Sequence, residues 1–171
     1  YLFEEERKAG SFYAKCKQAC DFWCSLWFWL EGEEIPNEWE YEQILQKIFN
    51  DSCKLPENKV KAYLNIARKV AGERRFLHWE LEFPGVFFDQ NSAKRNPGFD
   101  AVVGNPPWEV LMPMTQEFFS RYDPNFRRYD KKRAVEVMDD ILRDETIAIE
   151  WKNYCRQFEL LGEFIRNSGH F

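Results

Sequence analysis

Hydrophobic residues recur at three- and four-residue steps through the first part of the chain, a spacing that predicts amphipathic helices. We expect these helices over residues 3–31, 38–50 and 56–72. Pro56 lies where a first-turn proline is tolerated, and Gly72 is a plausible helix stop. Residues 1–75 are therefore predicted to form a helical insertion or subdomain.

The pattern changes after residue 76. Hydrophobic and polar residues alternate over residues 77–83, a period of two that predicts a half-buried strand. The short β-branched run 99–104 is typical of a buried parallel strand. A short helix is expected at 114–122, and one or two helices at 134–167. The predicted fold class is α/β, predominantly helical by residue count, with two or three strands.

Composition narrows the class of protein. The 171 residues suit one domain, and the net charge of −5 argues against a protein that coats nucleic acid by bulk electrostatics. The longest apolar stretch, Phe22–Leu30, is about half a membrane span. Five cysteines, an odd number, without a signal peptide favour a reduced protein. We expect a cytoplasmic location and no membrane partner.

The most specific feature is the segment Asn105-Pro106-Pro107-Trp108, which follows the second predicted strand. Two successive prolines fix φ and remove two backbone donors, so rigid carbonyl acceptors remain. Asn105 adds a side-chain acceptor and Trp108 a flat apolar face. Together these groups can hold a planar molecule that carries an exocyclic amine. The alternative is a Pro-Pro turn that caps a strand, with Trp108 in the core.

This segment, with Phe76–Pro84 and Gly98–Asp100 upstream, resembles the pattern of class I adenine-N6 DNA methyltransferases from large restriction-modification and phage-defence enzymes. The resemblance implies that residues 76–171 are part of a Rossmann-like catalytic domain. It also implies a target adenine flipped out of double-stranded DNA. Trp108 would stack on this base, Asn105 and Pro106 would accept hydrogen bonds from its amine, and Pro107 would stiffen the loop. S-adenosylmethionine is the implied methyl donor.

The donor site of this class normally includes a Gly-rich loop, and the sequence has no Gly-x-Gly. We therefore expect that loop N-terminal to Tyr1. The chain would then be a fragment that is inactive alone and that works with the remainder of its parent polypeptide.

A basic segment follows the motif, with aromatic residues between its cations. Its candidate DNA-contacting residues are Arg127, Arg128, Lys131, Lys132 and Arg133. One interpretation is a loop that contacts phosphates, and the other is the solvated start of a helix.

Two other groups favour structural roles. Cys16, Cys20 and Cys24 recur every four residues on one helix face, where free cysteines pack as small hydrophobes, and no metal site is predicted. His78 is expected to be a satisfied structural histidine.

Two alternative functions remain. Protein glutamine-N5 methyltransferases use a similar Asn-Pro-Pro motif, although their aromatic residue is typically tyrosine. A non-catalytic helical module for assembly or DNA recognition is the other alternative.

Overall fold

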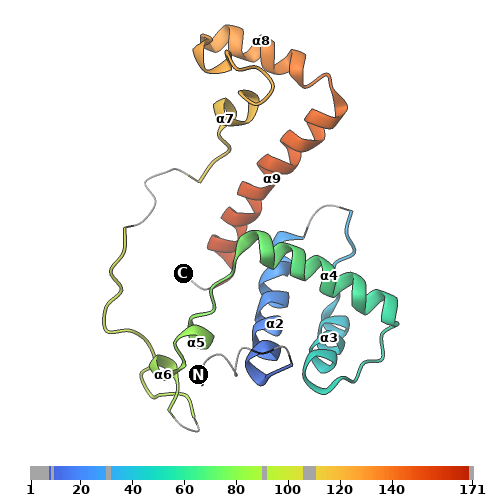
Figure 1. The fold of residues 1–171 in the computed structure, drawn as a ribbon, viewed down its shortest axis with the longest axis vertical. Helices are drawn as coiled ribbons and strands as arrows, with labels where there is room; N and C mark the ends of the chain where they lie inside the picture. The colour runs from blue at the N-terminus through green and yellow to red at the C-terminus, as the bar shows by residue number, and fades with distance from the viewer. Residues whose placement is uncertain (1–7, 9, 30–31, 90–91, 106–110, 170–171) are drawn as a thin grey trace. The chain divides into compact units, whose positions relative to one another are not determined.

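The computed structural model describes residues 8, 10–29, 32–89, 92–105 and 111–169, and these residues are mostly helical (Figure 1). The chain divides into two compact units, residues 1–105 and 106–171. The helical majority confirms that part of the predicted fold class. The two or three expected strands do not occur in the part of the chain that the structure describes, where an isolated bridge joins Phe88 and Ala93. The functional division at residue 75 stays a prediction.

The first unit contains three long helices. They are α2 (Phe12–Ser25), continued by the 3₁₀ turn η1 (Leu26–Phe28), α3 (Glu38–Asn50) and α4 (Glu57–Arg74). The predicted helices at 38–50 and 56–72 are confirmed. A single helix over 3–31 is wrong, because Gly10 has a φ of +85° and the Ser11 side chain caps the Ala14 amide at 3.1 Å. Both features start α2 at Phe12.

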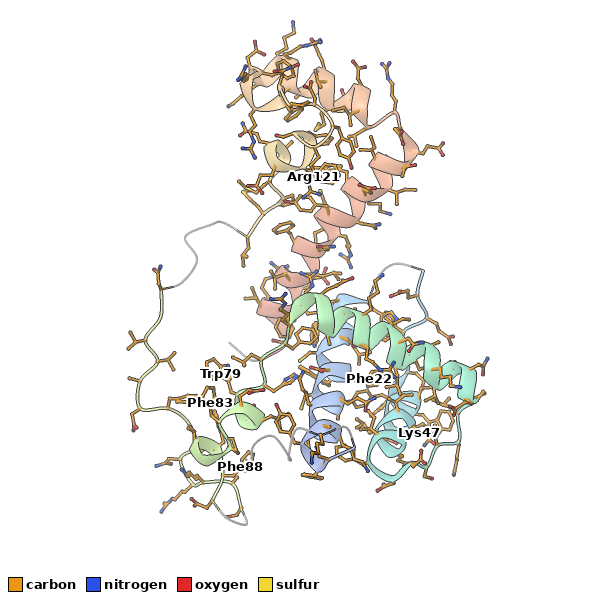
Figure 2. The ribbon with its side chains drawn as sticks, viewed as in Figure 1. Phe22, Lys47, Trp79, Phe83, Phe88 and Arg121 are labelled. Carbon is orange, nitrogen blue, oxygen red and sulfur yellow. The ribbon has the colours of Figure 1, made fainter. Side chains whose placement is uncertain are left out.

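The core of this unit lies between α2, α3 and α4. Phe22 is fully buried there (Figure 2), stacked on Tyr41 with ring centroids 5.5 Å apart and in edge contact with Trp29 at 6.4 Å. The buried residues of the cluster are Phe22, Trp29, Ile44, Ile48, Val60, Tyr63, Leu64 and Ala67. The apolar periodicity of the sequence therefore identifies the inward faces of these helices.

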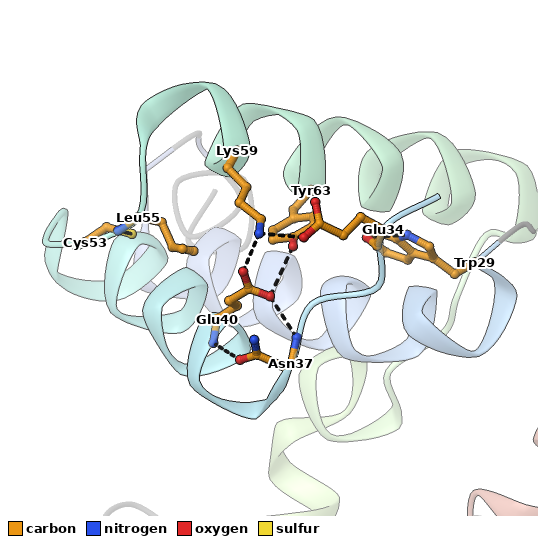
Figure 3. Close-up of polar contacts among 8 residues, drawn as sticks. All are labelled: Trp29, Glu34, Asn37, Glu40, Cys53, Leu55, Lys59 and Tyr63. Carbon is orange, nitrogen blue, oxygen red and sulfur yellow. Dashed lines mark hydrogen bonds and ion pairs between the residues drawn. The ribbon is translucent and has the colours of Figure 1, made fainter. Parts of the chain in front are cut away.

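A polar network joins the start of α3 to α4 (Figure 3). Asn37 and Glu40 form a reciprocal capping box, with hydrogen bonds of 3.0 and 2.9 Å. The buried Glu40 carboxylate also lies 2.5 Å from the Lys59 ammonium and accepts a hydrogen bond from the Tyr63 hydroxyl at 3.2 Å. Lys59 first, and then the Asn37 amide, hold the pKa of Glu40 below its usual value. The ionised carboxylate thus fixes α4 against α3.

Two short helices follow, α5 (Trp79–Glu82) and α6 (Pro84–Phe87). The predicted strand at 77–83 is therefore wrong. Trp79 and Phe83 lie four residues apart, so in a helical turn their rings fall on one face, where they stack with centroids 5.8 Å apart. This spacing fits an alternating pattern and a helical pattern equally well.

The second unit contains α7 (Thr115–Phe119), the 3₁₀ turn η2 (Phe126–Arg128), α8 (Lys131–Ile141) and α9 (Glu145–Asn167). Its core is formed by Phe118, Phe119, Phe126 and Val137. The Asp144 side chain caps the Thr146 and Ile147 amides, so the expected region 134–167 is two helices. None of the helices among the described residues has the length and apolar character that a membrane span requires.

Candidate functional site

Three aromatic rings hold Phe99, the first residue of the segment that leads to Asn105. Phe99 makes edge contacts with Trp79, Phe83 and Phe87, with ring centroids 5.4, 5.4 and 5.7 Å apart. We call these four residues the Phe99 cluster; Trp79 and Phe83 are labelled in Figure 2. Edge contacts of this kind are favourable because a positive ring edge meets a negative ring face. The cluster therefore ties the segment after Gly98 to α5 and α6.

Beyond Phe99 the chain is irregular and open to solvent up to Asn105. Val102 is 72% exposed and Val103 95% exposed, and Asn105 is also exposed. The expectation of a buried strand at 99–104 is therefore wrong for this structure. A strand needs a neighbour for its backbone hydrogen bonds, and no other strand occurs among the described residues to supply one.

Of the four predicted motif residues, the structure describes Asn105 alone. Pro106, Pro107 and Trp108 lie outside the described residues. Their roles as a base-holding set therefore stay predictions.

An open hollow of about 340 Å³ lies beside the Phe99 cluster. Its lining residues are Gly85, Val86, Lys94, Gly98, Phe99, Asp100 and Ala101. The Lys94 ammonium crosses this region and donates a hydrogen bond of 2.5 Å to the Gly85 carbonyl. The hollow thus adjoins the segment that ends at Asn105, five residues after Asp100.

Polar contacts connect α5 to α2. The Tyr13 hydroxyl donates to the Glu82 carboxylate at 2.8 Å, and His78 Nε2 lies 2.7 Å from Asp21 Oδ1. Burial raises the pKa of Asp21, but hydrogen bonds with His78 and Lys17 outweigh it and hold that pKa below its ordinary value. His78 is thus a satisfied structural residue, as expected, and the two contacts hold α5 against α2.

The predicted basic segment lies in the second unit, with every candidate cation exposed. Lys131, Lys132 and Arg133 form the first turn of α8, which Asp130 caps by accepting from the Arg133 amide at 2.8 Å. Cations in a first turn oppose the helix dipole, so helix stability does not explain their placement. Arg127 and Arg128 lie in η2, and the Arg127 Nε donates to the Ser120 hydroxyl at 3.2 Å. Both interpretations of this segment, phosphate contact and solvated helix start, are compatible with the geometry.

The three cysteines of α2 are partly buried and free. Burial raises the pKa of each thiol above its usual value, to about 11 for Cys24, so the thiols stay protonated at neutral pH. Within the described part of the chain, no three His, Cys, Asp or Glu side chains are arranged to hold a metal ion.

The sequence pattern gives no role to Phe87 and places Phe99 in a predicted strand. The sequence signal for this cluster is the density of aromatic residues between 76 and 99, in a segment that also contains two Pro-Gly pairs. Aromatic rings outside the helical core bury their surfaces by packing against one another, as the rings of the Phe99 cluster do.

These features, a helical unit that supports an exposed Asn105 next to a Pro-Pro-Trp sequence, agree with the comparison to known families. The family model described as Eco57I restriction-modification methylase matches residues 15–141, which is most of the chain and includes Asn105–Trp108. The chain belongs to the Eco57I restriction-modification methylase family, and so to the methyltransferases of restriction-modification systems. Neither the curated proteins nor the solved structures include a match to this chain.

Proposed function

We propose that the full-length protein is a DNA adenine-N6 methyltransferase that uses S-adenosylmethionine and serves a restriction-modification or related defence system. The observation that carries this proposal is an exposed Asn105 at the end of a segment whose first residue, Phe99, is held by three aromatic rings. The family match over this segment supports a methyltransferase, and its restriction-modification description favours DNA over a protein glutamine as substrate.

In this proposal Asn105 acts on the amine of a flipped adenine. Its side-chain carbonyl and the Pro106 carbonyl each accept a hydrogen bond from the amine, which draws the nitrogen lone pair out of conjugation with the ring. Trp108 stacks on the base, and Pro107 limits the movement of the acceptors. The contribution to rate is positioning together with stabilisation of the positive charge that develops on nitrogen.

No residue of this chain is proposed to bind the methyl donor. The glycines are isolated in the sequence, and Gly10 and Gly32, both with positive φ, flank α2 and η1 separately rather than forming one loop. A Gly-rich donor loop does not fit these residues. We propose that the donor-binding loop belongs to another part of the full-length protein.

We propose that the basic segment contacts the DNA backbone. Arg128, Lys131 and Lys132 are exposed, and within the described residues none has a carboxylate partner. Their charges are available to DNA phosphates.

The test uses Asn105→Ala in the full-length protein. We expect the methylation rate on unmethylated duplex DNA to fall by about 10²-fold or more, with donor binding unchanged, because one preorganised acceptor is lost. Asn96→Ala is the matched control, since Asn96 is also exposed and also precedes a proline. Equal rates for wild type and Asn105→Ala, or equal losses in both variants, would refute the role of Asn105.

A further inference from the structure

Positive charge is concentrated on α4 and its C-terminal cap. Residues 57–75 contain six cations and two acids, whereas the whole chain has a net charge of −5. Lys59 and Arg74 are engaged in the fold: Lys59 joins the Glu40 network, and Arg74 lies 4.7 Å from the centre of the Phe28 ring. The four other cations, Lys61, Arg68, Lys69 and Arg75, are exposed.

The charges of these four residues are weakly compensated. The Lys61 side chain is 71% exposed, and its ammonium lies 3.7 Å from Glu57, whose carboxylate is also shared with Lys47. Arg68 donates to the neutral Asn65 amide at 2.9 Å. Among the described residues, Lys69 and Arg75 form no ion pair. The surface therefore has a positive field that the fold itself does not neutralise.

Two acids, Glu57 and Glu73, are also exposed near the two ends of α4. The remaining exposed residues of the helix are small or carry amides, and they are Asn58, Ala62, Asn65 and Gly72. A Cβ on Gly72 would meet nothing within 4 Å, so the backbone is open there to close approach. The face carries no large apolar side chain, which makes it unsuited to a hydrophobic groove or to insertion into a membrane surface. Cations, amide donors and an accessible backbone are the groups that contact phosphates.

The spacing of the cations suits a polyanion. Lys61, Arg68 and Arg75 are seven residues apart, so along a helix axis each step is about 10 Å and the set spans about 20 Å. That length corresponds to about six base pairs of duplex, at roughly 3.4 Å each. Arg68 also lines a cavity of about 370 Å³ between α2 and α4, where Lys17 is neutralised by an ion pair with Asp21 at 2.8 Å.

We propose that this exposed face of α4 contacts the phosphate backbone of double-stranded DNA, in addition to the contacts proposed for the basic segment. This inference rests on the proposed function, because it takes DNA as the substrate. It assigns a positioning role, not a catalytic one, to Arg68 and Lys69.

The test measures the binding of the full-length protein to a fluorescein-labelled duplex of mixed sequence, by anisotropy, between about 50 and 200 mM KCl, where phosphate contacts are strongly salt-dependent. In Arg68→Gln/Lys69→Gln, we expect Kd to rise about tenfold or more and the slope of log Kd against log salt to fall by about two. Arg143→Gln/Arg166→Gln is the control. It also removes two exposed cations, one between α8 and α9 and one in α9. We expect it to match wild type.

A second variant, Ala62→Glu, adds an anion to the same face without removing a contact. It should weaken binding, whereas Gln157→Glu on α9 should not. If Kd and the salt slope are unchanged in both α4 variants and DNA is still methylated, the proposed DNA contact of α4 is overturned and the proposed function is not. The proposal is also overturned if the wild-type protein binds phosphatidylserine vesicles, the α4 variants do not, and DNA binding is the same in all of them. That result would indicate a membrane surface as the partner of α4. Failure of the wild-type protein to bind or methylate DNA overturns both proposals.

Discussion

Replacing Phe99 with alanine tests whether the Phe99 cluster positions Asn105. Phe99 is 37% exposed, so somewhat under two thirds of its surface is buried. A phenylalanine ring that buries roughly 120 Å² gains about 3 kcal/mol at about 25 cal/mol per Å². Alanine retains part of this area, so the loss is about 2 kcal/mol, which raises the population of an opened cluster about 30-fold.

The effect is read in two assays on the full-length protein. Hydrogen exchange at the α5 and α6 amides, such as Phe83 and Phe88, should accelerate by about that factor, because these amides are hydrogen-bonded to Trp79 and Pro84. The methylation rate should fall as well, since Asn105 is released from its anchor. Phe88→Ala is the control: its ring is 44% exposed and lies outside the cluster. Unchanged exchange and unchanged rate in Phe99→Ala would show that the cluster does not hold the segment.

Three further predictions concern residues within each of the two units. Glu40→Ala should lower the stability by about 2 kcal/mol and Tm by several degrees in a thermal melt, because the capping box and the Lys59 contact are both lost, whereas the exposed Glu42→Ala should change Tm little. The folded-state pKa of Asp21 is lowered, so its contribution to stability is complete above about pH 4 and is lost as pH falls through that lowered pKa. Urea unfolding of Asp21→Asn should therefore show a stability deficit at pH 7 that shrinks as the pH falls below about 4; a deficit that is constant with pH would contradict the ionic contact. Lys131→Gln/Lys132→Gln should weaken duplex binding in anisotropy and lower the salt slope by about two, and an unchanged slope would favour the solvated helix start.

The long helices were predictable because local signals and packing agree. Asn37 and Glu40 mark the start of α3 in sequence and form its capping box in the structure. Apolar residues at helical spacing on α3 and α4, such as Ile44 and Val60, are the ones that become buried.

The segment between α4 and the motif could not be predicted in the same way. An alternation that includes Trp79 and Phe83 contains a four-residue spacing, so a short window cannot separate a strand from a helical turn. The contact of Phe99 with these rings joins residues 16 and 20 positions apart, and no local pattern specifies it. The run at 99–104 has the composition of a buried strand, but strand formation depends on a neighbouring strand as well as on composition.

Within the candidate site, the role of Asn105 is a prediction from the chemistry of the Asn-Pro-Pro-Trp segment, and the structure adds how the chain before it is anchored. The exposed cations of α4 were not singled out from sequence, because burial decides which cations are available. Lys59 and Lys61 have the same charge, yet Lys59 is bound to Glu40 and Lys61 faces solvent.

The most direct measurement is the identity of the methylated product. The full-length protein is incubated with unmethylated duplex DNA and isotope-labelled S-adenosylmethionine, and the DNA is digested to nucleosides for mass spectrometry. We expect the label in N6-methyl-2′-deoxyadenosine and none in methylated deoxycytidine. Label in cytosine, label only in glutamine of an added protein, or no transfer to DNA would contradict it.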